Sequence, residues 1–326
     1  MKTLKLSYIW LPHFKETIIF HLIAKLSKLK IEIVNPNKCD LLFIGPYDQG
    51  TYKRKIYNSL KNKFKFFHKL QDHFKNLDIY QLSNRSSGPL RVFYCTETLP
   101  YNLFRADYYI SSSLGVFDDN HLRSPYWKDH LDWSHEGIVR DNNVGNAQRF
   151  GFFHDIESLL RNQGDDFLNK KNICFFTTAL QEPRRSFYKS FSKQFQVDGF
   201  GRYFDKKIKN HNESKFKKFD IMKNYSFNLC PENICYPGTY TEKIPDAFIG
   251  KCLPISWADN NVKIDFNPNA FINLNDHMGG GTDFQQLFDS LRDVNFLKKY
   301  SKEPLLLQKP NLNSEIKFVE KILAGL

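Results

Sequence analysis

The stretch from residue 225 to residue 257 constrains the fold more than any other part of this sequence. An apolar run over 225–230 leads into a loop punctuated by proline and glycine over 231–240. A helical pattern then covers 241–250, and a second apolar run covers 252–257. The order strand, loop, helix, strand is typical of a parallel sheet, whose binding sites form at the carboxyl ends of its strands. We therefore expect an α/β domain with a site where this loop leaves its strand.

The start of the predicted helix carries an unusual pattern of charge. Thr241 is expected to be the N-cap, and Glu242 lies in the first turn, where the helix dipole favours an anion. Lys243 does not match the dipole. Either an anionic ligand docks at this helix start, as phosphates do, or Glu242 and Lys243 form a solvated ion pair. The residues by themselves leave both interpretations open.

The rest of the chain continues the alternation of strands and helices. Expected strands cover 4–10, 31–34, 40–45, 90–95, 172–177 and 197–201, and expected helices cover 14–29, 53–77, 216–224, 283–298 and 314–326, with a further helix starting at 183. A chain of 326 residues suits two domains of about 150 residues each. We predict two Rossmann-like domains, 1–150 and 151–326, of which the last helix could pack back on the first domain.

The charge balance limits the classes of partner. The formal charge is +12, with 47 Lys and Arg against 35 Asp and Glu, which would suit nucleic acid, anionic lipid or an anionic sugar nucleotide. The basic residues are spread thinly, and no nucleic-acid motif accompanies them. A solvated basic face, or loose attraction to an anionic membrane surface, is therefore favoured over nucleic-acid binding.

The distribution of apolar residues bears on location. No run of about 18 uninterrupted apolar residues occurs, and charged residues interrupt the start where a signal peptide would need an apolar run. We expect a cytoplasmic protein that could contact the inner face of a membrane peripherally. The six cysteines fit that compartment as free thiols, and Cys230 and Cys235 have no matching partners for a zinc site.

Five short motifs stand in register in the second half of the chain. They are Phe227-Asn228-Leu229-Cys230, Glu232-Asn233, Thr241-Glu242-Lys243-Ile244, Pro254-Ile255-Ser256-Trp257 and Asp265-Phe266-Asn267-Pro268. This series resembles the donor-binding core of the alpha-1,3-fucosyltransferases, glycosyltransferase family 10. The resemblance implies the GT-B architecture, in which two Rossmann-like domains face each other across a cleft. An acceptor-binding domain would come first and a sugar-nucleotide domain second.

The first domain contains a candidate for the catalytic base. From the residues alone, a carboxylate just past a buried strand, such as Glu97, is more often a loop residue that caps a backbone N–H than a catalytic group. The strand Arg91-Val92-Phe93-Tyr94 resembles the family strand that is followed by two residues and then the general-base glutamate. The resemblance therefore implies that Glu97 is the general base.

The resemblance also implies donor-binding residues in the second domain. Counting back from the strand at Val197 places the arginine that contacts the donor pyrophosphate at Arg184, with Arg185 as the alternative. Lys243 would help to neutralise the departing GDP, and Glu242 would accept the ribose hydroxyls. Asn233 and Tyr240 would line the pocket.

Two positions of the loop depart from the family pattern. The family more often has an aliphatic residue where this chain has Tyr240, and an aromatic one where it has Pro231. These departures leave the choice of donor sugar open.

Together these features imply an inverting alpha-1,3-fucosyltransferase. Its donor would be GDP-fucose, and its acceptor a hydroxyl of N-acetylglucosamine or glucose in a surface oligosaccharide or glycolipid such as lipopolysaccharide. No cofactor and no divalent metal are expected to be essential. Two alternatives remain open, namely a glycosyltransferase that uses another GDP-sugar and an inactive glycan-binding module. The inactive module would not need Glu97, Arg184, Glu242 and Lys243 together.

Overall fold

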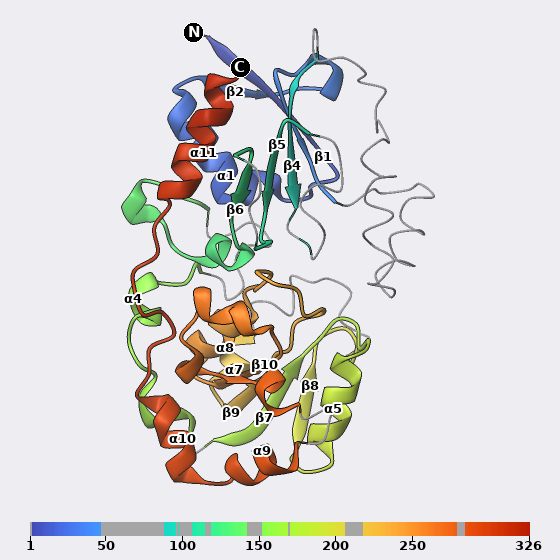
Figure 1. Ribbon diagram of the computed structural model, residues 1–326, viewed down its shortest axis with the longest axis vertical. Coiled ribbons are helices and arrows are strands. Elements are labelled where there is room, and N and C mark those ends of the chain that lie inside the picture. The colour runs from blue at the N-terminus through green and yellow to red at the C-terminus, as the bar shows by residue number, and fades with distance from the viewer. Residues whose placement is uncertain are drawn as a thin grey trace. The chain divides into compact units, whose positions relative to one another are not determined.

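The protein consists of two compact units in a computed structural model (Figure 1). The structure describes residues 2–46, 88–95, 97, 106–114, 119–141, 152–168, 170–205, 218–278 and 284–326. Unit 1 comprises Met1–Pro125 and Asn311–Leu326, and unit 2 comprises Tyr126–Pro310. The division after Pro125 lies earlier in the chain than the predicted boundary at residue 150. The predicted helix over 53–77 lies outside the described residues.

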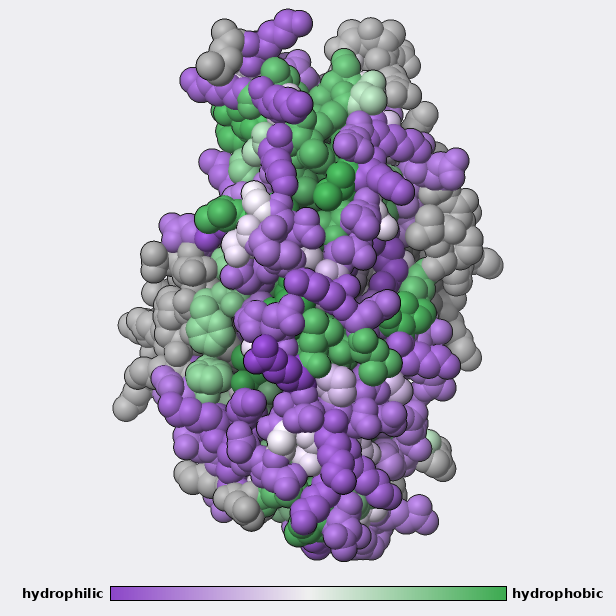
Figure 2. Space-filling view, turned by 90° about the vertical axis from the view of Figure 1, so that its left-hand side faces the viewer, coloured by the Kyte–Doolittle hydropathy of each residue, from purple (hydrophilic) through white to green (hydrophobic). Residues whose placement is uncertain are grey.

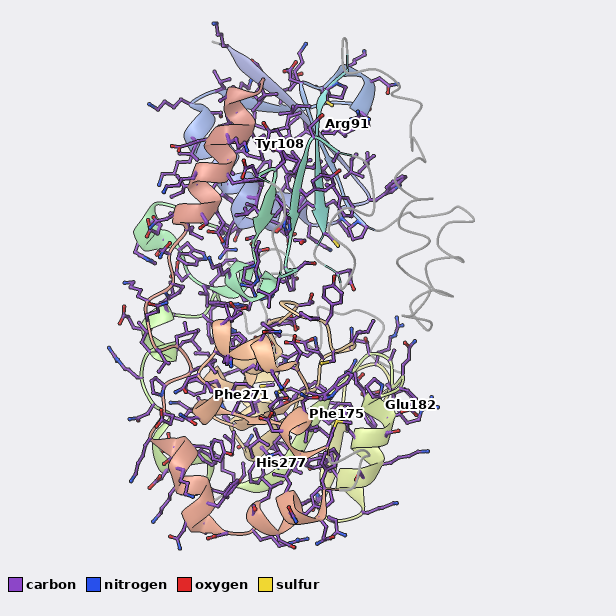
Figure 3. All side chains as sticks on the ribbon, viewed as in Figure 1. Arg91, Tyr108, Phe175, Glu182, Phe271 and His277 are labelled. Carbon is purple, nitrogen blue, oxygen red and sulfur yellow. The ribbon has the colours of Figure 1, made fainter. Side chains whose placement is uncertain are left out.

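Unit 1 is built on a six-stranded parallel sheet in the order β2-β1-β3-β4-β5-β6. The strands are β1 Thr3–Ile9, β2 Lys30–Ile33, β3 Leu41–Ile44, β4 Leu90–Cys95, β5 Tyr108–Ser111 and β6 His121–Arg123. Every residue of the central strand β3 is buried, which is why this strand reads as a continuous apolar run. Figure 3 marks β4 and β5 by Arg91 and Tyr108.

Among the described residues of unit 1, two helices pack against each other, and they come from opposite ends of the chain. Helix α1 spans Ile18–Ser27, where Thr17 is the N-cap and accepts a hydrogen bond from the Phe20 N–H. Helix α11 spans Asn313–Ala324 and packs against α1. The ring of its Phe318 packs edge to face against the ring of Tyr108 in β5, with 5.8 Å between the two ring centroids. The last helix therefore lies on the first unit, an arrangement that the sequence analysis had left open.

Unit 2 is built on a five-stranded parallel sheet in the order β11-β10-β9-β7-β8. The strands are β7 Lys171–Phe176, β8 Val197–Phe200, β9 Tyr225–Leu229, β10 Leu253–Ser256 and β11 Ile272–Asn273. The helices are α4 Ile156–Leu159, α5 Arg184–Ser192, α7 Lys218–Met222, α8 Lys243–Ile249, α9 Gln285–Ser290 and α10 Val294–Ser301. The helix predicted over 283–298 is therefore two helices. They separate where the Asp293 side chain caps the second by accepting from the Asn295 N–H.

Alternation along the strands of unit 2 divides its core between two faces. Ile173 and Phe175 of β7 pack on one face with side chains of α5 and α9, and Figure 3 labels Phe175 there. Cys174 faces the other side with Met222 of α7. Helices thus cover both faces of the sheet, as the pattern of a parallel α/β domain predicts.

The surface and the helices also bear on membrane contact. Most of the coloured face in Figure 2 is hydrophilic, with hydrophobic residues in small groups. Among the described residues, no helix combines the length and hydropathy that crossing a bilayer requires.

Candidate functional site

The candidate site lies at the carboxyl end of β9, where the chain passes through residues 230–242 before α8 begins. The backbone beyond β9 stays attached to β10, because the Cys230 N–H donates to the Ile255 carbonyl at 2.8 Å. The Glu232 N–H makes a longer contact with the Trp257 carbonyl at 3.4 Å. Glu232 therefore lies just beyond the carboxyl ends of β9 and β10, and only 4% of the residue is exposed.

The Glu232 carboxylate joins the two ends of this loop. Its Oε1 accepts from the Thr241 N–H at 2.9 Å and from the Thr241 hydroxyl at 2.7 Å. Its Oε2 accepts from the Lys243 ammonium at 2.7 Å. The same ammonium donates to the Thr241 hydroxyl oxygen at 2.8 Å. Glu232, Thr241 and Lys243 therefore form one connected network.

This network corrects two expectations about the start of α8. Thr241 is not the N-cap: the helix begins at Lys243 with Glu242 at the N-cap position, and Glu242 makes no capping hydrogen bond. The Thr241 hydroxyl is engaged elsewhere: it donates to Glu232, and its oxygen accepts from the Lys243 ammonium instead of from a backbone N–H of the helix. The expected solvated ion pair between Glu242 and Lys243 is also corrected, because Lys243 pairs with Glu232 instead. This pair is not solvated: the Lys243 side chain is 20% exposed and the Glu232 side chain 5% exposed.

Arg184 is the first residue of α5 and reaches the same loop. One Nη donates to the side-chain oxygen of Asn233 at 2.8 Å, and the other donates to the Phe176 carbonyl at 3.2 Å. Its Nε is buried and has no hydrogen-bond partner among the described residues. Arg185 is exposed, and one of its Nη atoms donates to the nearby Leu180 carbonyl at 3.1 Å. Of the two arginines, Arg184 is thus the one that contacts the loop.

Charges of both signs act on one another in this site. Burial lowers the pKa of Arg184, and the Glu232 and Glu242 carboxylates oppose that effect. Burial also lowers the pKa of Lys243, but the same two carboxylates outweigh it, so the pKa is raised above its ordinary value. Both cations are therefore protonated near neutral pH, each beside buried carboxylates.

Tyr240 is placed in the interior rather than at the surface of the loop. It is 1% exposed, and its hydroxyl donates to the Asp259 carboxylate. Burial, together with this hydrogen bond, raises the pKa of Tyr240 well above its ordinary value. Tyr240 thus ties the loop after β9 to the segment after β10, and its contact with a donor stays a prediction.

Glu97 lies in unit 1 immediately beyond β4, at the position that the sequence predicted. It is partly buried, and its backbone carbonyl accepts from the Cys95 thiol at 3.3 Å. Thr96 and residues 98–105 lie outside the described residues. The backbone position of Glu97 at the end of a buried strand is therefore established, while its catalytic role stays a prediction.

A second charged cluster connects α8 to neighbouring segments of unit 2. Asp246 is fully buried and accepts from Lys218 at 2.6 Å, while its other oxygen lies 2.8 Å from His154 Nε2. Burial would raise the pKa of Asp246, but Lys218 and His154 outweigh it and hold the pKa at about 2. The carboxylate therefore remains ionised and links α8 to α7 and to residue 154.

Sequence reasoning passed over two of these groups. Glu232 was quoted within a motif but given no role, and Asp259 was not considered. Both follow the carboxyl end of a buried strand, the same criterion that singled out Glu97. In the part of the chain that the structure describes, no three His, Cys, Asp or Glu residues gather in a group that could hold a metal ion.

Comparisons with known proteins agree with the motif analysis. Residues 168–301 match the model of "Glycosyltransferase family 10 (fucosyltransferase) C-term". Over 202 residues, or 57% of the chain, the sequence is 30% identical to "Alpha-(1,3)-fucosyltransferase FucT" of Helicobacter pylori. That match covers 41% of the length of the Helicobacter protein. The resemblance to family 10 is thereby confirmed.

Solved structures show the same fold. "Crystal Structure of alpha1,3-Fucosyltransferase" has a TM-score of 0.63 and 23% identity, and the likeness covers 99% of this chain and 90% of that one. The structure of the same title "with GDP-fucose" also has a TM-score of 0.63, with 91% of that chain covered. This likeness confirms the predicted GT-B fold class.

Proposed function

We propose that this chain, whose residues 168–301 match the C-terminal model of glycosyltransferase family 10, is an inverting alpha-1,3-fucosyltransferase that uses GDP-fucose. The observation that carries the proposal is a pair of cations, one at the start of α5 and one at the start of α8, that both contact the loop after β9. Arg184 contacts Asn233 in that loop, and Lys243 is anchored at its end by Glu232. Two protonated groups beside a strand end suit the pyrophosphate of a nucleotide sugar.

The donor site would stabilise the charge that develops when the bond between fucose and GDP breaks. The departing GDP gains negative charge, which Arg184 and Lys243 would neutralise in a site shielded from water. Glu242 would accept hydrogen bonds from the ribose hydroxyls, and Asn233 would line the pocket while it holds Arg184. Because two cations already serve the pyrophosphate, a divalent metal is not needed for this step.

The acceptor hydroxyl must lose its proton as it attacks. In the proposed reaction, the acceptor oxygen bonds to the anomeric carbon of fucose on the side opposite GDP. The bond between that carbon and the GDP oxygen breaks, and the configuration at the carbon is inverted. Glu97 would take the hydroxyl proton as general base. Its place two residues past β4 supports this role, because sites of parallel sheets form beyond the carboxyl ends of the strands.

The acceptor and the location belong to the same proposal. We expect a hydroxyl of N-acetylglucosamine or glucose in a surface oligosaccharide or glycolipid, of the lipopolysaccharide type. The enzyme would act in the cytoplasm, with peripheral contact to an anionic membrane. The net charge of +12 supports such contact.

The test is transfer from several nucleotide sugars to a small panel of acceptors, followed by mass spectrometry of the products. GDP-fucose should give an acceptor-dependent product that a fucosidase specific for the alpha-1,3 linkage removes. Transfer from GDP-mannose but not from GDP-fucose would establish the alternative GDP-sugar. Binding of glycan without any transfer would establish the inactive glycan-binding module.

A further inference from the structure

Glu232 offers little to a ligand, because three of the four acceptor positions of its carboxylate are occupied within the described residues and the group is almost fully buried. Its Oε1 is occupied by two donors from Thr241, and its Oε2 by the Lys243 ammonium. Only 4% of the residue is exposed. Its role must therefore be exerted through the residues that it holds.

Lys243, in contrast, retains one donor. A lysine ammonium carries three N–H groups, of which one is committed to Glu232 and one to the Thr241 hydroxyl. For the third, no acceptor is found among the described residues. The side chain keeps 20% of its surface exposed. An ammonium fixed by two bonds, with a third N–H still available, is prepared to receive an anionic oxygen.

We propose that Glu232 is the positioning residue of the donor site, which holds the Lys243 ammonium and both ends of loop 233–240 in the geometry that binds a pyrophosphate. This inference rests on the proposed function. A lysine side chain otherwise has four flexible carbons and large rotamer freedom, whose loss would weaken each binding event. The network of Glu232, Thr241 and Lys243 removes that freedom before the ligand arrives.

The alternative role for Glu232 predicts the opposite change in anion affinity when Glu232 is removed. If Glu232 were merely a counter-charge, it would compete with an anionic ligand for Lys243, and its removal would strengthen anion binding. If Glu232 positions Lys243, its removal weakens anion binding although the site becomes more positive. The direction of one affinity change therefore decides between the two roles.

The experiment measures the Kd of GDP and of inorganic pyrophosphate by calorimetry for Glu232→Gln, Lys243→Gln and the double variant. Each single variant should bind both ligands about 10- to 100-fold more weakly, the value of a charge-assisted hydrogen bond. The double variant should lose little more than Lys243→Gln alone, because Glu232 acts through Lys243. Unchanged or tighter binding by Glu232→Gln, or additive losses, would overturn the proposal.

The matched control is Glu157→Gln. Glu157 is the carboxylate partner of Lys309 in the same unit at 3.1 Å, with both side chains about half exposed. The affinities of this variant for GDP and pyrophosphate should stay within about twofold of the wild-type values, since an exposed ion pair contributes little to stability. Should Glu232→Gln fail to fold, Thr241→Val removes the hydroxyl from the network and leaves the ion pair. It should weaken binding in the same direction.

A pH profile separates positioning from a general structural defect. The charged groups that act on Lys243 are Glu232, Glu242 and Arg184. Without Glu232, burial and Arg184 are opposed by Glu242 alone, so the pKa of Lys243 falls. The affinity of Glu232→Gln should then decline from pH 7 to pH 9.5 more steeply than that of the wild type. Parallel profiles would contradict the assigned role.

The outcomes for the wild type distinguish this inference from the proposed function. Wild-type protein that binds GDP, with additive losses in the variants, overturns the positioning role and leaves the function intact. Wild-type protein that binds pyrophosphate but does not prefer GDP to UDP overturns the function, and the positioning role is then measured with pyrophosphate. Binding of neither ligand overturns both.

Discussion

The Arg184 guanidinium donates a hydrogen bond of 2.8 Å to the side-chain oxygen of Asn233. The bond joins the first turn of α5 to the loop after β9, although 49 positions separate the two residues. A second Nη is held by the Phe176 carbonyl at the end of β7. The guanidinium is therefore oriented by two different segments of unit 2.

This arrangement predicts a difference between adjacent arginines. Arg184→Gln should weaken GDP binding by about 1–3 kcal/mol, because a charge-assisted contact to the pyrophosphate is lost. Arg185→Gln should change GDP affinity by less than about 0.5 kcal/mol, since Arg185 is exposed and bonds the Leu180 carbonyl. Calorimetry with both variants is the measurement. Equal losses in the two would contradict the assignment of Arg184.

Removal of the candidate base should separate turnover from donor binding. Glu97→Gln keeps the shape of the side chain but removes the proton acceptor, so turnover should fall by roughly 10²–10⁴. GDP affinity should be almost unchanged, because the residues that we propose for binding the nucleotide all belong to unit 2. Glu136→Gln is the comparison variant, since Glu136 is a carboxylate at the end of the short helix Ser134–Glu136 whose side chain is 39% exposed. A larger loss of turnover in that variant would transfer the role to Glu136.

Tyr240 allows a test of whether it supports the loop or contacts the donor. Tyr240→Phe removes the hydroxyl that donates to Asp259, and should lower the free energy of unfolding by about 1–3 kcal/mol. GDP affinity should then stay within about threefold, because the ring is 1% exposed. Tyr203→Phe, at a residue that is 45% exposed, is the stability control. Normal stability with a large loss of GDP affinity would instead assign Tyr240 to the donor pocket.

The buried Asp246 should make unit 2 sensitive to acid. Its pKa is lowered from 3.8 to about 2. The ionised carboxylate therefore stabilises the fold at every pH above the pKa that this group has in the unfolded chain. That contribution, about 2 kcal/mol, should be lost as the pH falls from about 5 to about 2. Lys218→Gln removes the ammonium that holds this pKa down, so acid unfolding should begin at higher pH.

Denaturant unfolding at several pH values measures this shift. The matched control is Lys223→Gln, because Lys223 pairs with Asp220 at 2.7 Å on the protein surface. That variant should follow the wild-type pH dependence within about 1 kcal/mol. A Lys218→Gln curve that runs parallel to the wild-type curve would show that Lys218 does not hold the Asp246 carboxylate ionised.

Much of the fold could be predicted because its signals are local. Central parallel strands are buried on both faces, so β3 appears as an unbroken apolar run and β9 as a mostly apolar one that also contains Ser226 and Asn228. The ends of these runs then indicate where a site forms, which points to the loop after β9, whereas the role predicted for Glu97 came from the family resemblance. The single helix expected over 283–298 was wrong, because helical spacing continues across the break that the Asp293 cap creates.

The alternation of strands and helices, the family motifs and the loop that contains the candidate site can all be recognised in the sequence. Which charges meet in that site depends on the folded chain. Lys243 pairs with Glu232 rather than with its neighbour Glu242, and Thr241 bonds Glu232 instead of capping α8. Apolar periodicity is a property of one segment, whereas a hydrogen bond or ion pair depends on where the folded backbone places two side chains. That placement is fixed by the packing of β9, β10 and α8, which no single segment encodes.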